Sequence, residues 1–478
     1  MTLITLPKET RGRLTALLAA PRGRAIGVLG LGIAGRAMAL LLAHRGAKVL
    51  GADAKAQVPA AAELAAAGVE LRCGALDAET FSGVEGLAIS PGVDTRQAAV
   101  QATLARGVPV FGELELCGTL PAKVLAITGT NGKSTTTGLA GALVQACGRR
   151  AFVGGNFGEP IAGFVDGGGA SDVAVLELSS FQLETAYSFK ADVAVMLNIT
   201  PDHLDRYDSV DDYACTKRRL LENLGPEGTA ILSYDDPMVR AMAAHTRARV
   251  QWFSTRGACF LGDGAMLVGD AFVGQGVAAD LGPIELAHPR LFGRHNRENA
   301  LASLLAVRAL GLADAKQLGA GYAAFAGLEH RLELAGEVGG VRYINDSKAT
   351  NDDAAAIALA ALDRPVVLML GGRSKHGGYA GVRRESEGKL RAVVAFGEAR
   401  HEIAAAMGDA ARVVVVDTIA EAFGRAVDLA KSGDAVLLSP ACSSYDEFKD
   451  YTVRGRTFKA WVRALAAGAN AFALEDLR

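Results

Sequence analysis

The sequence predicts an α/β protein built from three tandem domains. Its 478 residues are enough for about three domains of roughly 150 residues each. Short apolar runs with strand composition alternate along the chain with Ala- and Leu-rich helical stretches, which is the pattern of parallel sheets joined by helices. Glycine-rich turns stand at two of the strand-to-helix junctions. We expect the domains to span residues 1–111, 112–327 and 328–478.

The first domain contains a strand, turn, helix and second strand that begin at Arg24. The turn is Gly30-Leu31-Gly32-Ile33-Ala34-Gly35, and the second strand, 48–53, ends at Asp53. Glycines in such a turn bring backbone N–H groups and the helix dipole close to a diphosphate, so this domain is predicted to be Rossmann-like. The pattern fits a nicotinamide dinucleotide, another nucleotide diphosphate, or a turn that only lets the helix pack on the strand.

The second glycine-rich turn joins the apolar strand 124–128 to the helical stretch 133–148. Backbone N–H groups of such a loop surround ATP phosphates, its lysine neutralises the β- and γ-phosphates, and the next hydroxyl helps to hold magnesium. The loop is shorter than the GxxxxGK[ST] form, because the residue five positions before Gly132 is not a glycine, and an ordinary strand-to-helix turn is the alternative. We predict a central P-loop ATPase-like domain with a parallel sheet, whose ATP contacts come from Gly129, Thr130, Asn131, Gly132, Lys133, Ser134 and Thr135.

The central domain contains further predicted strands at 173–178, 193–198 and 229–233. Candidate metal ligands lie at the carboxyl ends of two of these strands. Glu177 lies at the end of an apolar strand, where its carboxylate could hold the magnesium of a bound ATP. His203 lies in the polar segment 198–207, at the carboxyl end of another strand, which is the usual ligand edge of such a sheet. Taken alone, His203 fits a loop cap as well as a metal ligand.

The third domain repeats the strand and helix alternation and is predicted to be a second Rossmann-like domain. The Gly-rich stretch 261–283, before this domain, is predicted to be a hairpin insertion. Each predicted strand of the third domain precedes a helical stretch, and these strands are 342–345, 366–370, 392–396, 412–416 and 435–438.

Composition excludes several classes of protein. The net charge is −2, so no strong single-sign field is available to bind nucleic acid or an anionic membrane. The six cysteines form no CxxC pair, which argues against a disulfide scaffold or a zinc site. No apolar run reaches the roughly 18 residues of a transmembrane helix, and the first residues do not resemble a signal peptide. We expect a cytoplasmic protein, a monomer without nucleic-acid partners or membrane insertion.

Several motifs, taken in order, resemble the Mur ligase family of ATP-dependent enzymes that assemble the peptidoglycan peptide. They are GTNGKST, ELSSFQLE and NITPDHLDRY, followed by GRHNREN at 293–299 and LEHR at 328–331. The strings NDSKATN at 345–351 and LSPACSSYDEFK at 438–449 are similar to those of the glutamate-adding members. The resemblance covers essentially the whole chain.

The resemblance implies where the nucleotides bind. The N-terminal domain would hold the UDP part of the substrate, with Asn156 of the central domain orienting the muramoyl group. The central loop would hold ATP, with Asn296 and Asn299 near the adenine and with Arg331 and Asp346 reaching the nucleotide from the C-terminal domain. The implied UDP-substrate contacts of the N-terminal domain are Gly30, Gly32, Ile33, Ala34, Gly35, Asp53 and Ser90.

The resemblance also implies the metal and amino-acid sites. Two magnesium ions would be held by Ser134, Glu177, His203 and Lys217, with Lys217 carbamylated by CO2. Catalytic roles would fall to Lys133, His203 and Lys217. Glutamate would bind to Lys348, Thr350, Lys375, Ser444 and Tyr451. The sequence departs from the family around Lys375 and at Tyr445.

The implied reaction adds D-glutamate to UDP-N-acetylmuramoyl-L-alanine through an acyl phosphate, releasing ADP and phosphate, in the peptidoglycan synthesis that supports cell shape and division. The alternative is the same ligation with L-glutamate or another acidic amino acid. A dehydrogenase would leave the phosphate loop and Glu177 without a role. A non-catalytic nucleotide-binding regulator would tolerate the loss of magnesium ligands, yet all candidate ligands are present.

Overall fold

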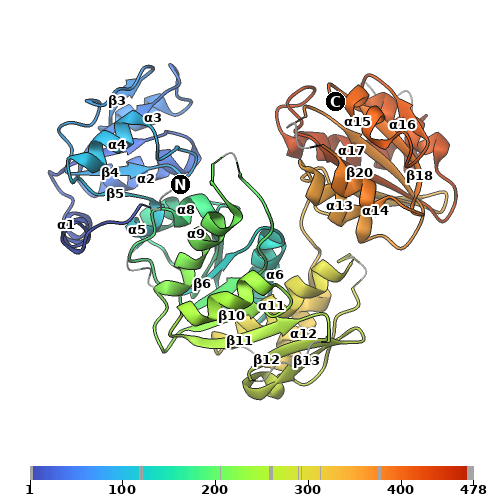
Figure 1. Ribbon diagram of the computed structural model, residues 1–478, viewed down its shortest axis with the longest axis horizontal. Coiled ribbons are helices and arrows are strands. Elements are labelled where there is room, and N and C mark those ends of the chain that lie inside the picture. The colour runs from blue at the N-terminus through green and yellow to red at the C-terminus, as the bar shows by residue number, and fades with distance from the viewer. Residues whose placement is uncertain are drawn as a thin grey trace. The chain divides into compact units, whose positions relative to one another are not determined.

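The computed structural model contains three sheets flanked by helices, which confirms the predicted α/β class (Figure 1). The described residues are 4–117, 120, 122–204, 206–257, 262–288, 290–291, 293–312, 314–374 and 378–470. They form two compact units, one of Met1–Leu286 with Glu298–Phe325 and one of Ala287–Arg297 with Ala326–Arg478. The first unit contains two of the three sheets, so the limits at residues 111 and 327 stay predictions.

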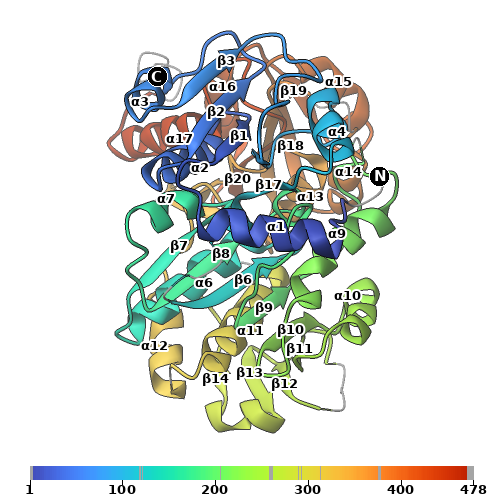
Figure 2. The same cartoon turned by 90° about the vertical axis from the view of Figure 1, so that its left-hand side faces the viewer.

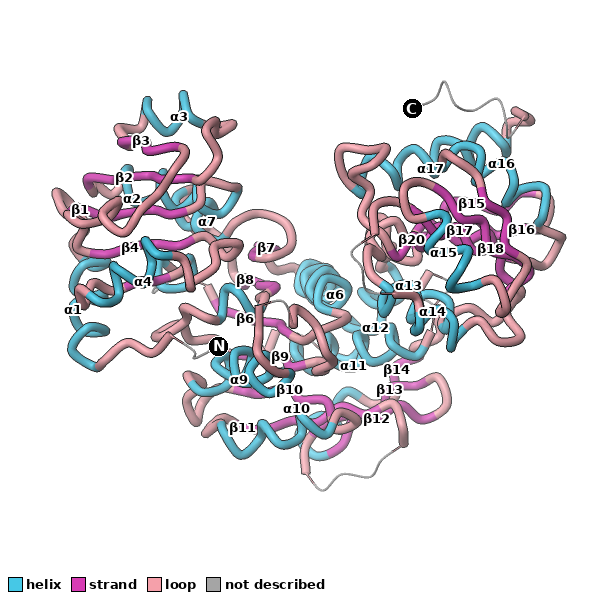
Figure 3. The backbone as a smooth tube through the Cα atoms, turned by 45° about the horizontal axis from the view of Figure 1, so that its top comes forward, coloured by secondary structure: helices cyan, strands magenta, loops and turns pink. Residues whose placement is uncertain are grey.

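The first sheet is entirely parallel, with strand order β3-β2-β1-β4-β5 (Figure 3). Its central strand is an apolar run whose residues are almost all buried, which places it at the middle of the sheet. The strands are β1 (Ala25–Leu29), β2 (Lys48–Asp53), β3 (Glu70–Cys73), β4 (Gly86–Ile89) and β5 (Val110–Phe111). The helices are α1 (Lys8–Ala19), α2 (Ile33–His44), α3 (Ala61–Ala66), α4 (Ala98–Ala105) and α5 (Glu113–Leu116).

The central sheet has the strand order β14-β13-β12-β11-β10-β9-β6-β8-β7, and Figure 2 shows β6 between β8 and β9 with α6 across the sheet. From β7 to β12 all neighbours are parallel, but β13 pairs antiparallel with both β12 and β14. The predicted hairpin is therefore confirmed as β12 and β13, and it makes one edge of the otherwise parallel sheet antiparallel.

The strands of this sheet are β6 (Lys123–Thr128), β7 (Ala151–Gly155), β8 (Val173–Glu177), β9 (Val193–Met196), β10 (Thr229–Ser233), β11 (Arg249–Ser254), β12 (Gly264–Val268), β13 (Ala271–Gln275) and β14 (Ile284–Glu285). The accompanying α-helices are α6 (Lys133–Ala146), α7 (Ile161–Asp166), α8 (Ser180–Leu183), α9 (Val210–Glu222), α10 (Pro237–Met242), α11 (Arg294–Ala309) and α12 (Ala315–Ala324). The short 3-10 helices are Ala243–His245 and Gly276–Leu281.

The third sheet has the order β15-β16-β20-β17-β18-β19, in which only β15 pairs antiparallel. Apolar residues of α16 and α17, including Trp461, pack on one face, and α13 and α15 cover the other. The strands are β15 (Glu333–Val338), β16 (Val341–Asn345), β17 (Val366–Gly371), β18 (Leu390–Phe396), β19 (Val413–Val415) and β20 (Ala435–Ala441). The helices are α13 (Asp352–Ala360), α14 (Ala380–Glu385), α15 (Arg400–Met407), α16 (Ile419–Leu429) and α17 (Tyr451–Ala466).

In the part of the chain that the structure describes, no helix combines the length and hydropathy needed to cross a bilayer.

Candidate active site

The phosphate-binding loop runs from β6 into α6, and two of its glycines are required by geometry. Gly129 has a φ of 150° and Gly132, the N-cap of α6, has a φ of 87°. A Cβ at Gly132 would lie 2.3 Å from Oδ1 of Asn299. Both positions therefore need glycine, as the sequence pattern predicted for a loop that turns sharply into a helix.

The loop is held against the segment that follows β9. The backbone N–H of Thr130 donates to the Asn198 carbonyl at 2.8 Å, and the N–H of Asn131 donates to Asn198 Oδ1 at 2.8 Å. Nζ of Lys133 donates to the carbonyls of Gly129 at 3.0 Å and Thr130 at 2.8 Å. The lysine thus lies over the loop, where it can exchange these carbonyls for phosphate oxygens.

Glu177 ends β8 beside this loop with one carboxylate oxygen unpartnered. The residue is 2% exposed, and its Oε1 accepts a hydrogen bond of 2.7 Å from Nδ2 of Asn156. Its Oε2 is buried and has no hydrogen-bond partner among the described residues. A buried carboxylate oxygen without a donor is costly unless a cation is near it, so Glu177 fits the magnesium site expected for it.

Lys217 extends from α9 to the start of the same loop. It is 1% exposed, and its Nζ donates to the Gly129 carbonyl at 2.9 Å and to Thr128 Oγ1 at 3.3 Å. The amine also lies 4.7 Å from the ring centroid of Tyr213. Burial, and then the nearby charge of Lys133, hold the pKa of Lys217 well below its ordinary value. Both causes disfavour the charged form of this lysine.

His203 lies in the turn between β9 and α9, on a strained backbone. Its φ is 54°, a conformation that is uncommon for residues other than glycine. The imidazole ring centroid is 4.7 Å from that of Phe181, and its Nε2 lies 3.5 Å from Oδ2 of Asp202. The side chain is about half exposed, so it is accessible to a substrate.

The chain's own acidic and imidazole groups do not form a closed metal site. Within the described ranges, no three His, Cys, Asp or Glu side chains converge on a metal-sized position. Ser134, the other residue predicted to hold magnesium, is 1% exposed in the first turn of α6. A cation near Glu177 would therefore need further oxygen ligands from phosphates, water or a modified side chain.

The predicted UDP-substrate residues gather at the carboxyl ends of β1, β2 and β4. Asp53 Oδ2 accepts from the Leu31 N–H at 2.7 Å, and its Oδ1 accepts from the Lys55 N–H at 2.9 Å. Asp53 thus holds the glycine turn to β2. Ser90 follows β4, and its Cβ would lie 3.1 Å from a Cβ added at Gly30.

The turn residues have distinct environments. Gly35 is buried, and a Cβ there would lie 1.7 Å from the carbonyl oxygen of Gly30. In contrast, a Cβ at Gly32 would meet nothing within 4 Å, and the side chain of Ile33 is 80% exposed beside it. Ala34 is the second residue of α2. Gly35 therefore serves the packing of α2 against the turn, whereas Gly32 and Ile33 face open space.

The C-terminal unit contains a buried carboxylate, Asp346. Its Oδ2 accepts from Ser439 Oγ at 2.7 Å and its Oδ1 from the Leu332 N–H at 3.1 Å. Burial raises the pKa of Asp346 to about 7, and the charge of Arg331 opposes this shift only weakly. Asp346 and Arg331, both predicted to reach the nucleotide, are thus near one another.

The predicted glutamate residues lie partly together at the start of α17. Nζ of Lys348 is 5.6 Å from the ring centroid of Tyr451, and Ser444 is buried in the preceding loop. Thr350 is half-buried just before α13, whereas Lys375 lies outside the described residues. Asn296 and Asn299 lie on α11, and Oδ1 of Asn299 accepts from Thr136 Oγ1 at 3.2 Å.

Three side-chain contacts were not predicted from the sequence. Asn156 holds Glu177, although the two are separated by 21 residues. Arg454 is buried under the Cys442 and Ser347 carbonyls, to which its Nη2 donates at 3.2 and 2.8 Å. Arg206 forms a buried ion pair with Glu184. No local signal in the sequence identifies these partners, because each pair is brought together only by the fold.

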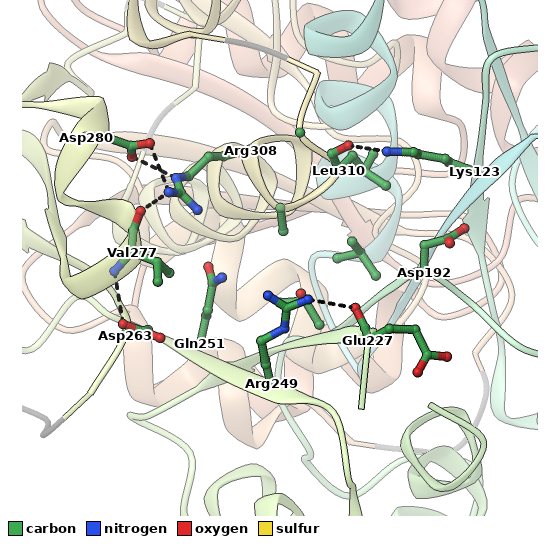
Figure 4. Close-up of a pocket in the computed structure, with 14 residues that line it drawn as sticks. Lys123, Asp192, Glu227, Arg249, Gln251, Asp263, Val277, Asp280, Arg308 and Leu310 are labelled. Carbon is green, nitrogen blue, oxygen red and sulfur yellow. Dashed lines mark hydrogen bonds and ion pairs between the residues drawn. The ribbon is translucent and has the colours of Figure 1, made fainter. Parts of the chain in front are cut away.

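A polar pocket of about 560 Å³ lies away from the phosphate loop, at the amino ends of the central strands (Figure 4). Lys123, Val193, Thr229 and Arg249, the first residues of β6, β9, β10 and β11, line it. Charged groups on its wall are already paired: Arg308 binds Asp280, and Lys123 donates to the Leu310 carbonyl. Because ligands of parallel sheets bind at the carboxyl ends of strands, this pocket is not the candidate active site.

Comparison with known proteins places the chain in a family. Three family profiles match: the "Mur ligase MurD-like, N-terminal domain" over residues 24–112, the "Mur ligase middle domain" over 127–307 and the "Mur ligase, glutamate ligase domain" over 330–442. A protein from Anaeromyxobacter dehalogenans is 43% identical over 466 residues, covering 92% of this chain and 98% of its own length. One from Pelotomaculum thermopropionicum is 41% identical over 454 residues, covering 92% and 98%.

Solved structures agree at the level of the fold. UDP-N-acetylmuramate-alanine ligase MurC from Thermotoga maritima aligns with a TM-score of 0.56 and 17% identity, covering 93% of this chain and 100% of that one. A pseudomurein peptide ligase type C from Methanothermus fervidus aligns with a TM-score of 0.53 and 18% identity, covering 87% and 96%.

The chain belongs to the Mur ligase family, and it is accordingly an ATP-dependent ligase of peptidoglycan precursor synthesis. Within the family it groups with the MurD-type members. The relatives from Anaeromyxobacter and Pelotomaculum, and others at 38–40% identity, are named UDP-N-acetylmuramoylalanine--D-glutamate ligase. The resemblance of the motifs to this family is thereby confirmed.

Proposed function

We propose that this ligase joins D-glutamate to UDP-N-acetylmuramoyl-L-alanine, with ATP converted to ADP and phosphate. The observation that carries the proposal is the convergence of Lys133, the unpartnered oxygen of Glu177 and the buried amine of Lys217 on one phosphate-binding loop. The names of relatives at about 40% identity over more than nine-tenths of the chain support the choice of substrates. ATP and UDP-linked precursors are metabolites of the cytoplasm, where we place the reaction.

In the first step, the L-alanyl carboxylate attacks the γ-phosphate of ATP and forms an acyl phosphate with release of ADP. A free carboxylate is a poor acyl donor, and two anions must meet for this transfer. Lys133 and the N–H groups of the loop offset the repulsion and stabilise charge on the transferring phosphoryl group. Glu177 and Ser134 would hold magnesium, which supplies further positive charge at the phosphates.

Lys217 is proposed to act as a carbamate. Its amine, whose charged form burial disfavours, would add to CO2 and release a proton, which would turn a potential cation into an anion. The anion would face Lys133 and provide oxygen ligands for a second magnesium ion, beside Glu177. The carbamate would supply further oxygen ligands where no three acidic, imidazole or thiol side chains converge within the described residues.

In the second step, the neutral amine of glutamate attacks the acyl phosphate, and the tetrahedral intermediate expels phosphate and leaves the amide. Lys348, Thr350, Ser444 and Tyr451, together with Lys375, are proposed to hold the two carboxylates of glutamate. His203 is proposed to receive the proton of the amine or to organise the metal and water. Its partial exposure makes either role sterically accessible.

The experiment is a phosphate-release assay with purified protein, ATP, magnesium and UDP-N-acetylmuramoyl-L-alanine. D-glutamate, L-glutamate and no amino acid are compared, and the product is identified by mass. Release that depends on D-glutamate with a product of matching mass is expected. A preference for L-glutamate or another acidic amino acid would change the assigned amino-acid substrate. Phosphate release that needs no amino acid would contradict the proposed ligation.

A further inference from the structure

Glu184 and Arg206 form an ion pair inside the first compact unit. The Glu184 side chain is 1% exposed and that of Arg206 is 9% exposed. Nε of Arg206 donates to Oε1 at 2.9 Å and its Nη2 donates to Oε2 at 2.5 Å, so the pair is bidentate. Tyr207 adds a hydrogen bond from its hydroxyl to Oε1 at 2.7 Å. Such a pair fixes both the position and the plane of the guanidinium group.

The guanidinium also binds the loop that follows β4 in the N-terminal sheet. Nη2 of Arg206 donates to the carbonyl of Val93 at 2.9 Å. The N–H of Val93 in turn donates to the Ser90 carbonyl at 2.9 Å, and Val93 Cγ2 would lie 2.8 Å from a Cβ at Gly30. Val93 therefore connects Arg206 both to Ser90 and to the glycine turn that is proposed to hold the UDP group.

The other side of Arg206 supports the turn that carries His203. The backbone N–H groups of Arg206 and Tyr207 donate to the His203 carbonyl at 2.9 and 3.0 Å. The guanidinium carbon lies 4.2 Å from the ring centroid of Phe181, and that ring lies 4.7 Å from the His203 imidazole. The left-handed backbone of His203 is thus held by neighbours that Arg206 fixes in place.

We infer that Arg206, clamped by Glu184, is a positioning residue that holds the Ser90–Val93 loop of the UDP-substrate site at a set place relative to the His203 turn of the phosphate-transfer site. The inference rests on the proposed function, because it concerns the alignment of the precursor with ATP. A buried ion pair adds little net stability compared with apolar side chains of similar volume. Its effect is therefore expected in the alignment of substrates.

The test compares Arg206→Lys with the wild-type protein and with the double variant Glu184→Gln/Arg206→Met. Lysine keeps the charge but loses the planar, bidentate contact and the hydrogen bond to Val93. The double variant avoids an unpaired buried charge and keeps an acceptor for Tyr207. Arg391→Lys is the matched control, because Arg391 also pairs with a buried carboxylate, Asp434, but lies in the C-terminal unit.

We expect kcat/KM for UDP-N-acetylmuramoyl-L-alanine to fall on the order of 10²-fold in both Arg206 variants, since a shift of about 1 Å in a positioned reactant has an effect of that size. The KM for glutamate should change little. The ratio of phosphate released to amide formed should rise above that of the wild type, because a misaligned acyl phosphate is open to water. The control should match the wild type in all three measurements.

The inference would be overturned if the folded Arg206→Lys variant had the same kcat, the same KM values and the same ratio of phosphate to amide as the wild type. It would also be overturned if the variant only had a lower melting temperature and a smaller fraction of active protein, with unchanged kinetics in that fraction. If the wild-type protein shows no D-glutamate dependence, the proposed function fails instead, and calorimetric binding of UDP and ADP then tests the inference. Weaker UDP binding with unchanged ADP binding in Arg206→Lys would support it, and equal affinity for UDP would overturn it.

Discussion

Replacing Gly35 by alanine tests whether the first glycine turn is shaped by packing as well as by binding. The new Cβ would lie 1.7 Å from the carbonyl oxygen of Gly30 and 2.8 Å from its carbonyl carbon. Ordinary contact begins near 3.4 Å, so the separation must grow by about 1.7 Å, the difference between 3.4 and 1.7. Both opposing atoms belong to the backbone, so α2 or the turn must move. Overpacking of this kind costs about 1–3 kcal/mol and sometimes more.

Gly163→Ala is the matched control, because Gly163 is the third residue of α7 as Gly35 is the third residue of α2. A Cβ at Gly163 would meet nothing within 4 Å. Alanine in an open helix position should stabilise the unit by about 0.5–1 kcal/mol. Both variants belong to the first compact unit, so their melting temperatures can be compared directly.

Thermal unfolding followed by circular dichroism measures the difference. For a unit of this size, 1 kcal/mol corresponds to about 2–4 °C, so Gly35→Ala should lower the melting temperature by roughly 2–12 °C. Gly163→Ala should leave it equal or slightly higher. A calorimetric titration with UDP should show weaker binding only for Gly35→Ala, because Gly30 is displaced. A melting temperature for Gly35→Ala at or above the wild-type value would refute the packing argument.

Three further outcomes are expected. Glu177→Gln keeps the contact with Asn156 but removes the charge, so the magnesium concentration for half-maximal activity should rise about 10–100-fold; an unchanged magnesium dependence would contradict the assigned ligand. Burial raises the pKa of Asp346 from 3.8 to about 7, so the folded state keeps a proton that the unfolded state loses. The free energy of unfolding should therefore fall on the order of 4 kcal/mol as the pH rises from about 4 to 7, and Asp346→Asn should remove that slope in pH-dependent denaturation. Protein in buffer with 13C-labelled CO2 should give a carbamate resonance that Lys217→Arg lacks, and full activity of an unmodified lysine would disprove the carbamate.

Much of the fold could be predicted because its strands are continuous apolar runs. The strand before the phosphate loop, the loop and α6 were predicted together, since an apolar run, glycines and a helical stretch follow one another without a gap. The hairpin of β12 and β13 was predicted from its glycines. In contrast, β3 was missed because its four residues are largely exposed and include Glu70 and Arg72. β15 was missed because its residues are half-buried or exposed.

Residues of the candidate site could be predicted from the sequence where a short motif around the residue indicates its role. Lys133 is visible as the lysine between a glycine-rich loop and a helix, and Glu177 as the last residue of an apolar strand. Lys217 is different, because α9 also carries Arg218 and Arg219, and helical periodicity does not show which cation approaches the phosphate loop. Only the packing of α9 on the central sheet reveals that Lys217 reaches Gly129. The partners of Arg206 are hidden in the same way, since Val93 is 113 residues away.

The strand orders of the three sheets decide which strands lie at sheet edges, where two folded molecules could pair with each other. Each sheet has two edge strands whose unpaired backbone groups could accept a strand from another molecule. Two edges, β5 and β14, are only two residues long, and β19 has three. The longer edges β3 and β15 carry glutamates, and β7 follows Arg149 and Arg150. Within the described residues, then, each sheet edge is a strand of at most six residues that is very short, carries a charged side chain or follows one directly, and these features disfavour amyloid-like addition.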